Sequence, residues 1–309
     1  MTDRPISRRR VLQGGTAITT AALAGCSSVT SLLGGGGGRP YLSWLAAPDE
    51  LDMDHYRFRY FKPATWQEYE DDFDEAYYEQ FAGYFSGFVG EIGLDLDETE
   101  SVMFPAFGQV ISHTAGQDTV VEELEDRDFE ENGEHEGYTI YTLQSEEFFE
   151  SSITTVGVSG NAVVRAGGTS TDAEWTSTEI VESIIDAKAG EVDRYHQEND
   201  DFDRVTSAVS TGALTTATTQ EEVDDGNPVS GVFENQVARG SSLSLGSDTS
   251  HATAVRVLAD SDDTDRDAAE EWMEDGGGFD DDLQDRSLSI NGRVIKVTGT
   301  IKTDDLGGN

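Results

Sequence analysis

The spacing of apolar residues predicts both helices and strands in this chain. Between Asp71 and Phe88, aromatic residues recur at steps of three and four, which places them on one face of a helix. These aromatic residues are Phe73, Tyr77, Phe81, Tyr84, Phe85 and Phe88. Acidic residues open the segment and complement the positive end of the helix dipole. We expect the aromatic face to pack in the core, and the alternative is that it lines an apolar ligand cavity.

Capping signals predict three further helices. The capping box Thr176–Glu179 opens a helix that continues through Ala189 and ends before Gly190. Asn199 can cap a second helix, and Thr264 or Asp265 can cap a third over Arg266–Glu274. The inward-facing residues expected in the helix after Asn199 are Phe202, Val205 and Val209.

Nine strand-like runs lie between these helices. Many of them alternate apolar with polar residues and are separated by Gly or Asn, a pattern typical of antiparallel hairpins. The runs are Tyr56–Phe61, Phe107–His113, Tyr138–Leu143, Ile153–Val158, Ala162–Ala166, Ser241–Leu245, Ala252–Ala259, Ser287–Ile290 and Val294–Ile301. The sequence therefore predicts an α+β fold, with helices packed against antiparallel sheets.

Two segments of the first half resemble two segments of the second. Val120–Leu124 resembles Ala268–Trp272, and the hairpin Val158–Arg165 resembles Ser289–Lys296. These similarities indicate two α+β units, 41–170 and 171–309, and the alternative is one continuous domain. The order of helices and strands resembles a duplicated ferredoxin-like module of secreted proteins, a resemblance that rests on pattern alone.

The first 25 residues have the features of an export signal. Met1–Arg10 is basic, and Val11–Ala24 is uncharged but too short to cross a membrane. The segment resembles a twin-arginine signal with Arg8 and Arg9 as the pair. Val11 and Gln13 replace the Phe and Lys that this family of signals prefers.

Cys26 is the only cysteine and directly follows Leu23-Ala24-Gly25, which resembles a lipobox. This resemblance implies lipid attachment at Cys26. Residues 26–40 then contain five consecutive glycines and form a flexible tether. The combined pattern resembles uncharacterised haloarchaeal twin-arginine lipoproteins. It implies a membrane contact through the lipid on Cys26 and a location on the outer face of the cytoplasmic membrane.

The charge of the chain is strongly acidic. It contains 62 Asp and Glu against 20 Lys and Arg, a net charge of −42, and only four lysines. At molar salt the Debye length is about 3 Å, so such carboxylates repel one another weakly. We therefore expect a protein adapted to high salt, rather than a disordered chain or a surface for a basic partner. The acidic balance also argues against nucleic acid as a ligand.

Motifs that would indicate catalysis are not found in the sequence. There is no phosphate loop, dinucleotide fingerprint, zinc motif or nucleophile elbow. Asp260–Asp265 with Glu271 approaches a calcium loop, but Asp265 occupies the position that requires Gly. Glu134-His135-Glu136 could hold a cation, and an ordinary solvated loop explains it better. We predict no catalytic, cofactor-binding or metal residues, and no cofactor.

These observations favour a lipid-anchored, salt-adapted envelope protein that is not an enzyme and acts as a binding or assembly module. One alternative is the solute-binding component of an importer, which should show alternating βαβ units in two lobes. A hydrolase is a further alternative. The sequence does not specify a ligand or a protein partner.

Overall fold

The computed structural model describes residues 38–145, 152–170, 175–279 and 283–306. It confirms an α+β fold built on one antiparallel sheet of 12 strands, in the order β11-β12-β10-β9-β8-β1-β2-β3-β7-β6-β5-β4. The strands are β1 Arg57–Phe61, β2 Thr99–Phe104, β3 Gln109–His113, β4 Glu130–His135, β5 Tyr138–Ser145, β6 Ser152–Ser159, β7 Ala162–Ser170, β8 Leu214–Thr219, β9 Gln236–Ser244, β10 Thr249–Leu258, β11 Gln284–Asn291 and β12 Val294–Lys302.

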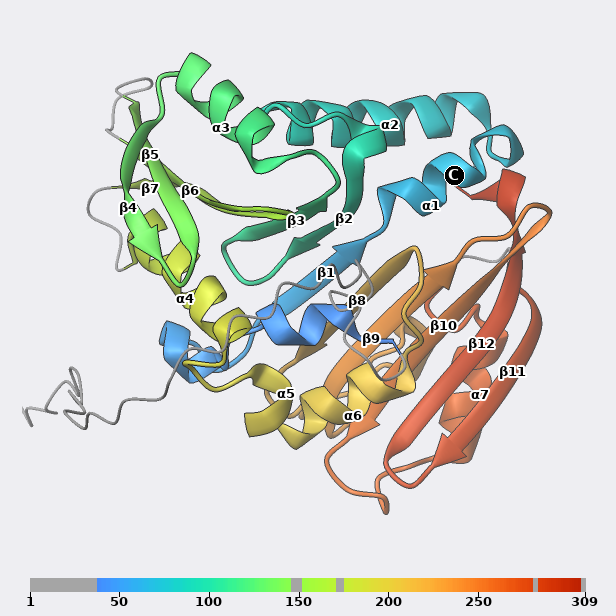
Figure 1. Cartoon of the computed structure of the whole chain (residues 1–309). Helices are drawn as coiled ribbons and strands as arrows, with labels where there is room; N and C mark the ends of the chain where they lie inside the picture. Colours follow the sequence, from blue (N-terminus) through green and yellow to red (C-terminus); the bar gives the residue numbers. More distant parts are fainter. Residues whose placement is uncertain (1–37, 146–151, 171–174, 280–282, 307–309) are drawn as a thin grey trace, which may run out of the picture.

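Helices cover both faces of this sheet (Figure 1). The helices are α1 Pro63–Glu68, α2 Glu75–Gly90, α3 Gln117–Asp126, α4 Ser177–Ala189, α5 Tyr195–Glu198, α6 Asp200–Ala208 and α7 Arg266–Glu274. We call the side packed by α1, α2, α3 and α7 the α7 face, and the side packed by α4, α5 and α6 the α6 face. Short 3-10 turns join the elements, among them η2 (Pro40–Trp44) on the α6 face.

Three predicted helices begin at the residues expected to cap them. The Thr176 side chain accepts a hydrogen bond from the backbone of Glu179, and α4 ends at Gly190 in the left-handed region. Asn199 caps α6 through the backbone N–H of Phe202. Asp265 caps α7, which has the predicted bounds. These caps satisfy backbone N–H groups that the first turn of a helix leaves free.

The aromatic segment differs from its prediction at both ends. A 3-10 turn occupies Glu70–Asp72, and α2 starts only at Glu75 because the Asp74 side chain caps it through the backbone of Tyr77. The aromatic face is also not uniformly buried. Phe85 lies in the core, whereas the Tyr84 side chain is 63% exposed.

The sheet also contains three strands, β2, β4 and β8, that the residue pattern did not predict. β4 consists of six polar or Gly residues, Glu130–His135, and has no apolar alternation. β8 is rich in Thr, and every second residue in Thr215–Thr219 is buried. β2 pairs with β3, β4 with β5 and β8 with β9, so their partners place them in the sheet rather than their own residue pattern.

The order of strands and helices repeats around the two pairs of segments that resemble each other in sequence. In the first half, β3 leads to α3 and pairs with the returning strand β7 of the β6–β7 hairpin. In the second half, β10 leads to α7 and pairs with β12 of the β11–β12 hairpin. Antiparallel pairing of β1 with β8 joins the halves into one sheet. The described neighbouring strands all pair antiparallel, as the sequence predicted.

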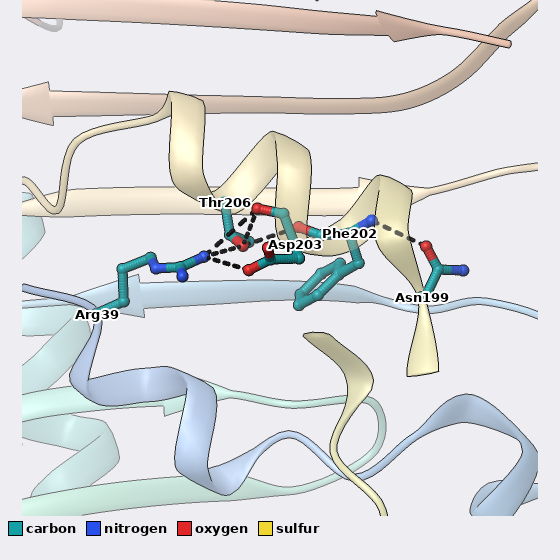
Figure 2. A network of polar contacts seen from close by, with 5 residues as sticks. All are labelled: Arg39, Asn199, Phe202, Asp203 and Thr206. Carbon is teal, nitrogen blue, oxygen red and sulfur yellow. Dashed lines mark hydrogen bonds and ion pairs between the residues drawn. The ribbon is translucent and has the colours of Figure 1, made fainter. Parts of the chain in front are cut away.

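The start of the described chain is fixed to α6 (Figure 2). The Arg39 guanidinium donates to a carboxylate oxygen of Asp203 and to the hydroxyl of Thr206, both at 2.9 Å. Phe202, one residue before Asp203, is fully buried against the α6 face. Arg39 therefore lies at a defined point beside α6.

Candidate functional site

Three arginines occupy one line across the α7 face of the sheet. Arg57 on β1 lies opposite Thr218 on β8, and Thr218 lies opposite Arg239 on β9. Arg239 in turn lies opposite Arg256 on β10. Residues directly opposite one another in an antiparallel sheet point to the same side. We call Arg57, Arg239 and Arg256 the arginine row, and Arg59 lies one row further along β1.

The arginine row has no carboxylate partner among the described residues. The ion pairs among the described residues involve other basic side chains. None of them joins Arg57, Arg59, Arg239 or Arg256 to an Asp or Glu. Acidic residues outnumber basic ones threefold in this protein, 62 against 20. Like charges directly opposite one another destabilise a sheet. The row is therefore an unusual concentration of uncompensated positive charge.

Arg256 is the most buried member of the row, with 8% of its surface exposed. Its guanidinium lies over the ring of Trp272 at 4.5 Å. Nε donates to the carbonyl of Gly231 at 2.6 Å, and Nη1 donates to the carbonyl of Val255 at 3.0 Å. Burial, with a smaller contribution from Arg239, lowers the pKa of Arg256 to about 10.

Two glycines in the left-handed region bring backbone close to Arg256. Gly231 (φ +70°) ends a short 3-10 turn, and Gly278 (φ +84°) follows α7. A Cβ atom at Gly231 would lie 2.8 Å from Nη2 of Arg256 and 2.7 Å from the indole nitrogen of Trp272. Only glycine fits both this conformation and this space. The glycines thus fix the buried guanidinium in place.

A hollow of about 190 Å³ lies over the row. It is lined by the three arginines together with Thr216, Thr218, Gly240, Ser241, Ala254 and Gly278. The side chains that line it contribute hydrogen-bond donors from guanidinium and hydroxyl groups and include no carboxylate. Arg57 Nε already donates to the Thr216 hydroxyl at 3.2 Å. Burial, followed by the charges of Arg59 and Arg239, lowers the pKa of Arg57.

An aromatic shelf adjoins this hollow where β1 meets α2. We define the shelf as Phe61, Tyr84, Phe85, Phe104 and Ala106, which with Arg57 and Arg59 line a second hollow of about 420 Å³. The rings of Phe61 and Phe85 lie 5.1 Å apart, and those of Phe61 and Phe104 lie 6.0 Å apart. Arg57 borders both hollows. The arginine row and the aromatic shelf therefore form one groove with a cationic end and an apolar end.

The groove has the groups that recognise an oxyanion attached to an apolar body. Guanidinium groups donate parallel hydrogen bonds to phosphate and carboxylate oxygens, and hydroxyl groups add further donors. Burial of Arg256 strengthens such contacts because the local dielectric is lower than in water. The shelf offers aromatic surface to the remainder of the molecule.

The site residues expected from the sequence are not among those that the structure describes. Arg8, Arg9 and Cys26 fall outside the described residues. Among the described helices, none has the length and apolar character needed to cross a membrane.

Residues of the two candidate cation loops are engaged with other protein groups. Asp265 accepts hydrogen bonds from the first turn of α7, and Asp263 accepts one from the Asn235 side chain. His135 contacts Asp186 on α4 at 2.6 Å. Within the described parts of the chain, no group of three His, Cys, Asp or Glu side chains is placed to hold a metal ion.

Sequence reasoning did not find the arginine row. Arg57 and Arg59 alternate within a predicted strand, and Arg256 falls within another, so part of the signal was present. Their meeting depends on the register of four strands, and β8 was itself not predicted. The alternation of Arg with aromatic residues in Arg57–Phe61 was the local sign that one face of this strand carries charged side chains.

Comparison of the sequence with protein-family models and with curated proteins finds no match. Among solved structures, crystal form III of TP0453 is similar, with a TM-score of 0.47 and 14% identity over 86% of this chain and 96% of that chain. Crystal form IV has a TM-score of 0.45, and crystal form I has 0.44, each at 14% identity. With scores this low, the similarity carries no argument about function.

Proposed function

We propose that this protein is a lipid-anchored binding module of the cell envelope whose groove on the α7 face binds a small organic oxyanion. The observation that carries the proposal is the arginine row. Arg57, Arg239 and Arg256 are held side by side without a carboxylate partner among the described residues. An anion bound across the row would offset the repulsion between these groups.

The dimensions of the groove support a ligand of modest size. Neighbouring strands lie roughly 4.8 Å apart, so the three steps from Arg57 to Arg256 span about 14 Å. One phosphate or carboxylate can therefore be held by two of the arginines at once, while the aromatic shelf takes an apolar group. We favour binding over catalysis because the lining residues provide cationic, hydroxyl and apolar groups only.

The envelope location rests on the sequence. The resemblance to a lipobox puts the lipid on Cys26, and the glycine-rich segment that follows spaces the folded part from the membrane. The chain then enters the fold at Arg39, on the α6 face, so the groove lies on the opposite side of the sheet. Soluble ligands would have access to a groove placed in this way.

Calorimetric titration with phenyl phosphate tests the proposed function. In molar KCl the site must select the oxyanion over chloride, and we expect phenyl phosphate to bind more tightly than inorganic phosphate because only it reaches the shelf. Arg239→Gln and Arg256→Gln should each weaken binding about tenfold or more, since hydrogen bonds to charged groups contribute roughly 1.5–3 kcal/mol.

The matched control is Arg266→Gln. Arg266 is an exposed arginine that pairs with Glu270 in the same helix, away from the groove. Its substitution should leave the affinity unchanged. An equal loss in Arg266→Gln, or no measurable binding by the unmodified protein, would overturn the proposal.

A further inference from the structure

A second pocket lies on the α6 face, on the other side of the sheet from the arginine row. Its walls are the aromatic side chains of Tyr41, Trp44 and Tyr60 and the apolar side chains of Met103 and Val110. The pocket has a volume of about 220 Å³. It lies between η2, the last turn of α4 and strands β1 to β3.

Two of the four lysines of the chain line this pocket. Lys62 follows β1, and Lys188 comes from the last turn of α4, so distant parts of the sequence bring them together. The Lys188 ammonium lies 4.8 Å from the Trp44 ring and donates to the Ser43 hydroxyl at 3.3 Å. The Lys62 ammonium has no hydrogen bond or ion pair with any residue that the structure describes.

The other two lysines of the chain lie outside this pocket. Lys302 is exposed on the last strand, and Lys296 donates to the carbonyl of Ala208. In this acidic protein, neither Lys62 nor Lys188 forms an ion pair with a described carboxylate, although Glu100 lies at the edge of the pocket. Burial lowers the pKa of both lysines, which is the cost of holding ammonium groups beside aromatic walls.

We propose that this pocket is a second binding site, which takes a small carboxylate with an apolar body. The carboxylate is held by Lys62 and Lys188, and the apolar body packs against Trp44 and Tyr60. Polar side chains of Ser101, Ser112 and Asn161 provide further hydrogen bonds at the wall. The volume equals that of about seven water molecules and lies below the range of drug-sized pockets, so the ligand is small.

The two sites are independent in their chemistry and position. They lie on opposite faces of β1, where Arg57 and Arg59 alternate with Phe58 and Tyr60. The lysine pocket has aromatic walls and point charges, which suit a carboxylate on a flat apolar body. This inference therefore does not rest on the arginine row.

Titration with benzoate tests the lysine pocket, with benzyl alcohol as a neutral probe of the same shape. We expect benzoate to bind at least about tenfold more tightly than benzyl alcohol, since charge-assisted hydrogen bonds contribute roughly 1.5–3 kcal/mol. Binding should change the fluorescence of Trp44, and Trp44→Phe should remove that change. The comparison of benzoate with benzyl alcohol uses the unmodified protein and therefore does not require a variant to fold.

Variants then assign the charges. Lys62→Gln and Lys188→Gln should each weaken benzoate binding about tenfold, whereas the control Lys302→Gln should leave it unchanged. Arg239→Gln should also leave it unchanged, which separates this pocket from the arginine row. Equal affinity for benzoate and benzyl alcohol, or an equal loss in Lys302→Gln, would overturn the inference.

Discussion

Arg239 and Arg256 are directly opposed on neighbouring strands, and neither has a carboxylate partner among the described residues. This arrangement costs stability when the groove is empty, because like charges opposite one another repel. We therefore predict that Arg239→Gln stabilises the ligand-free protein by roughly 0.2–1 kcal/mol. The same substitution weakens phenyl phosphate binding.

Thermal unfolding with and without phenyl phosphate measures both effects. Without ligand, Arg239→Gln should unfold at a higher temperature than the unmodified protein. Phenyl phosphate should raise the unfolding temperature of the variant by less than it raises that of the unmodified protein. Destabilisation of the ligand-free protein by Arg239→Gln would show that the row is structural.

Gly231 supports the position of Arg256, and substitution with Ala should displace it. The new Cβ would lie 2.8 Å from Nη2 of Arg256, in a left-handed conformation that Ala adopts at a cost. We expect Gly231→Ala to weaken phenyl phosphate binding. Gly292→Ala is the control, since Gly292 also has positive φ (+57°) but has open space where its Cβ would be. Calorimetry should separate the two variants, and equal affinities would contradict the support assigned to Gly231.

His113, at the end of β3, should make the protein sensitive to acid. Its side chain is 1% exposed, and burial lowers its pKa below the usual 6.5. The unfolded chain therefore binds a proton at His113 first as the pH falls below about 6.5, and the free energy of unfolding decreases in that range. His113→Gln should reduce this slope between pH 7 and 5 in denaturant titrations. His251→Gln, at an exposed position, serves as the control and should keep the full slope.

Salt should be required for the fold. The net charge of −42 leaves many carboxylates close together on the surface. When NaCl falls to about 0.1 M, the Debye length grows to about 10 Å and the repulsion increases. We expect the far-UV helix signal to decline over this dilution and to return when salt is restored. A signal that stays constant would contradict salt adaptation.

Cys26→Ser should release the protein from the membrane. The proposed lipid needs a thiol, and two acyl chains hold a protein far more firmly than one. Cell fractionation should place the variant in the medium and the unmodified protein with membranes. Retention of Cys26→Ser in the membrane fraction would exclude the lipid at this residue as the anchor.

The sequence predicted those parts of the fold that local chemistry controls. The caps at Thr176, Asn199 and Asp265 start helices where expected because each satisfies backbone groups within one turn. The helix predicted over Asp71–Phe88 began too early, because periodicity alone did not show that Asp74 acts as a cap, and the observed helix continues to Gly90.

The candidate sites were beyond prediction for a different reason. Arg57 is far in sequence from Arg239 and Arg256, and the three meet only through the register of β1, β8, β9 and β10. Strand β8 lacks the apolar pattern of a predicted strand, since Thr fills most of its positions. Lys62 and Lys188 meet through packing between a strand end and a helix end, which no local pattern encodes.

The pairing of β1 with β8 determines what a fragment of this protein can bind. Arg57 comes from one side of that junction, and Arg239 and Arg256 come from the other. A fragment containing either half alone would lack part of the groove, even if it folded. Co-expressed fragments cut between α6 and β8 would regain ligand binding only on reassembly, so the ligand would report directly on the union of the two halves.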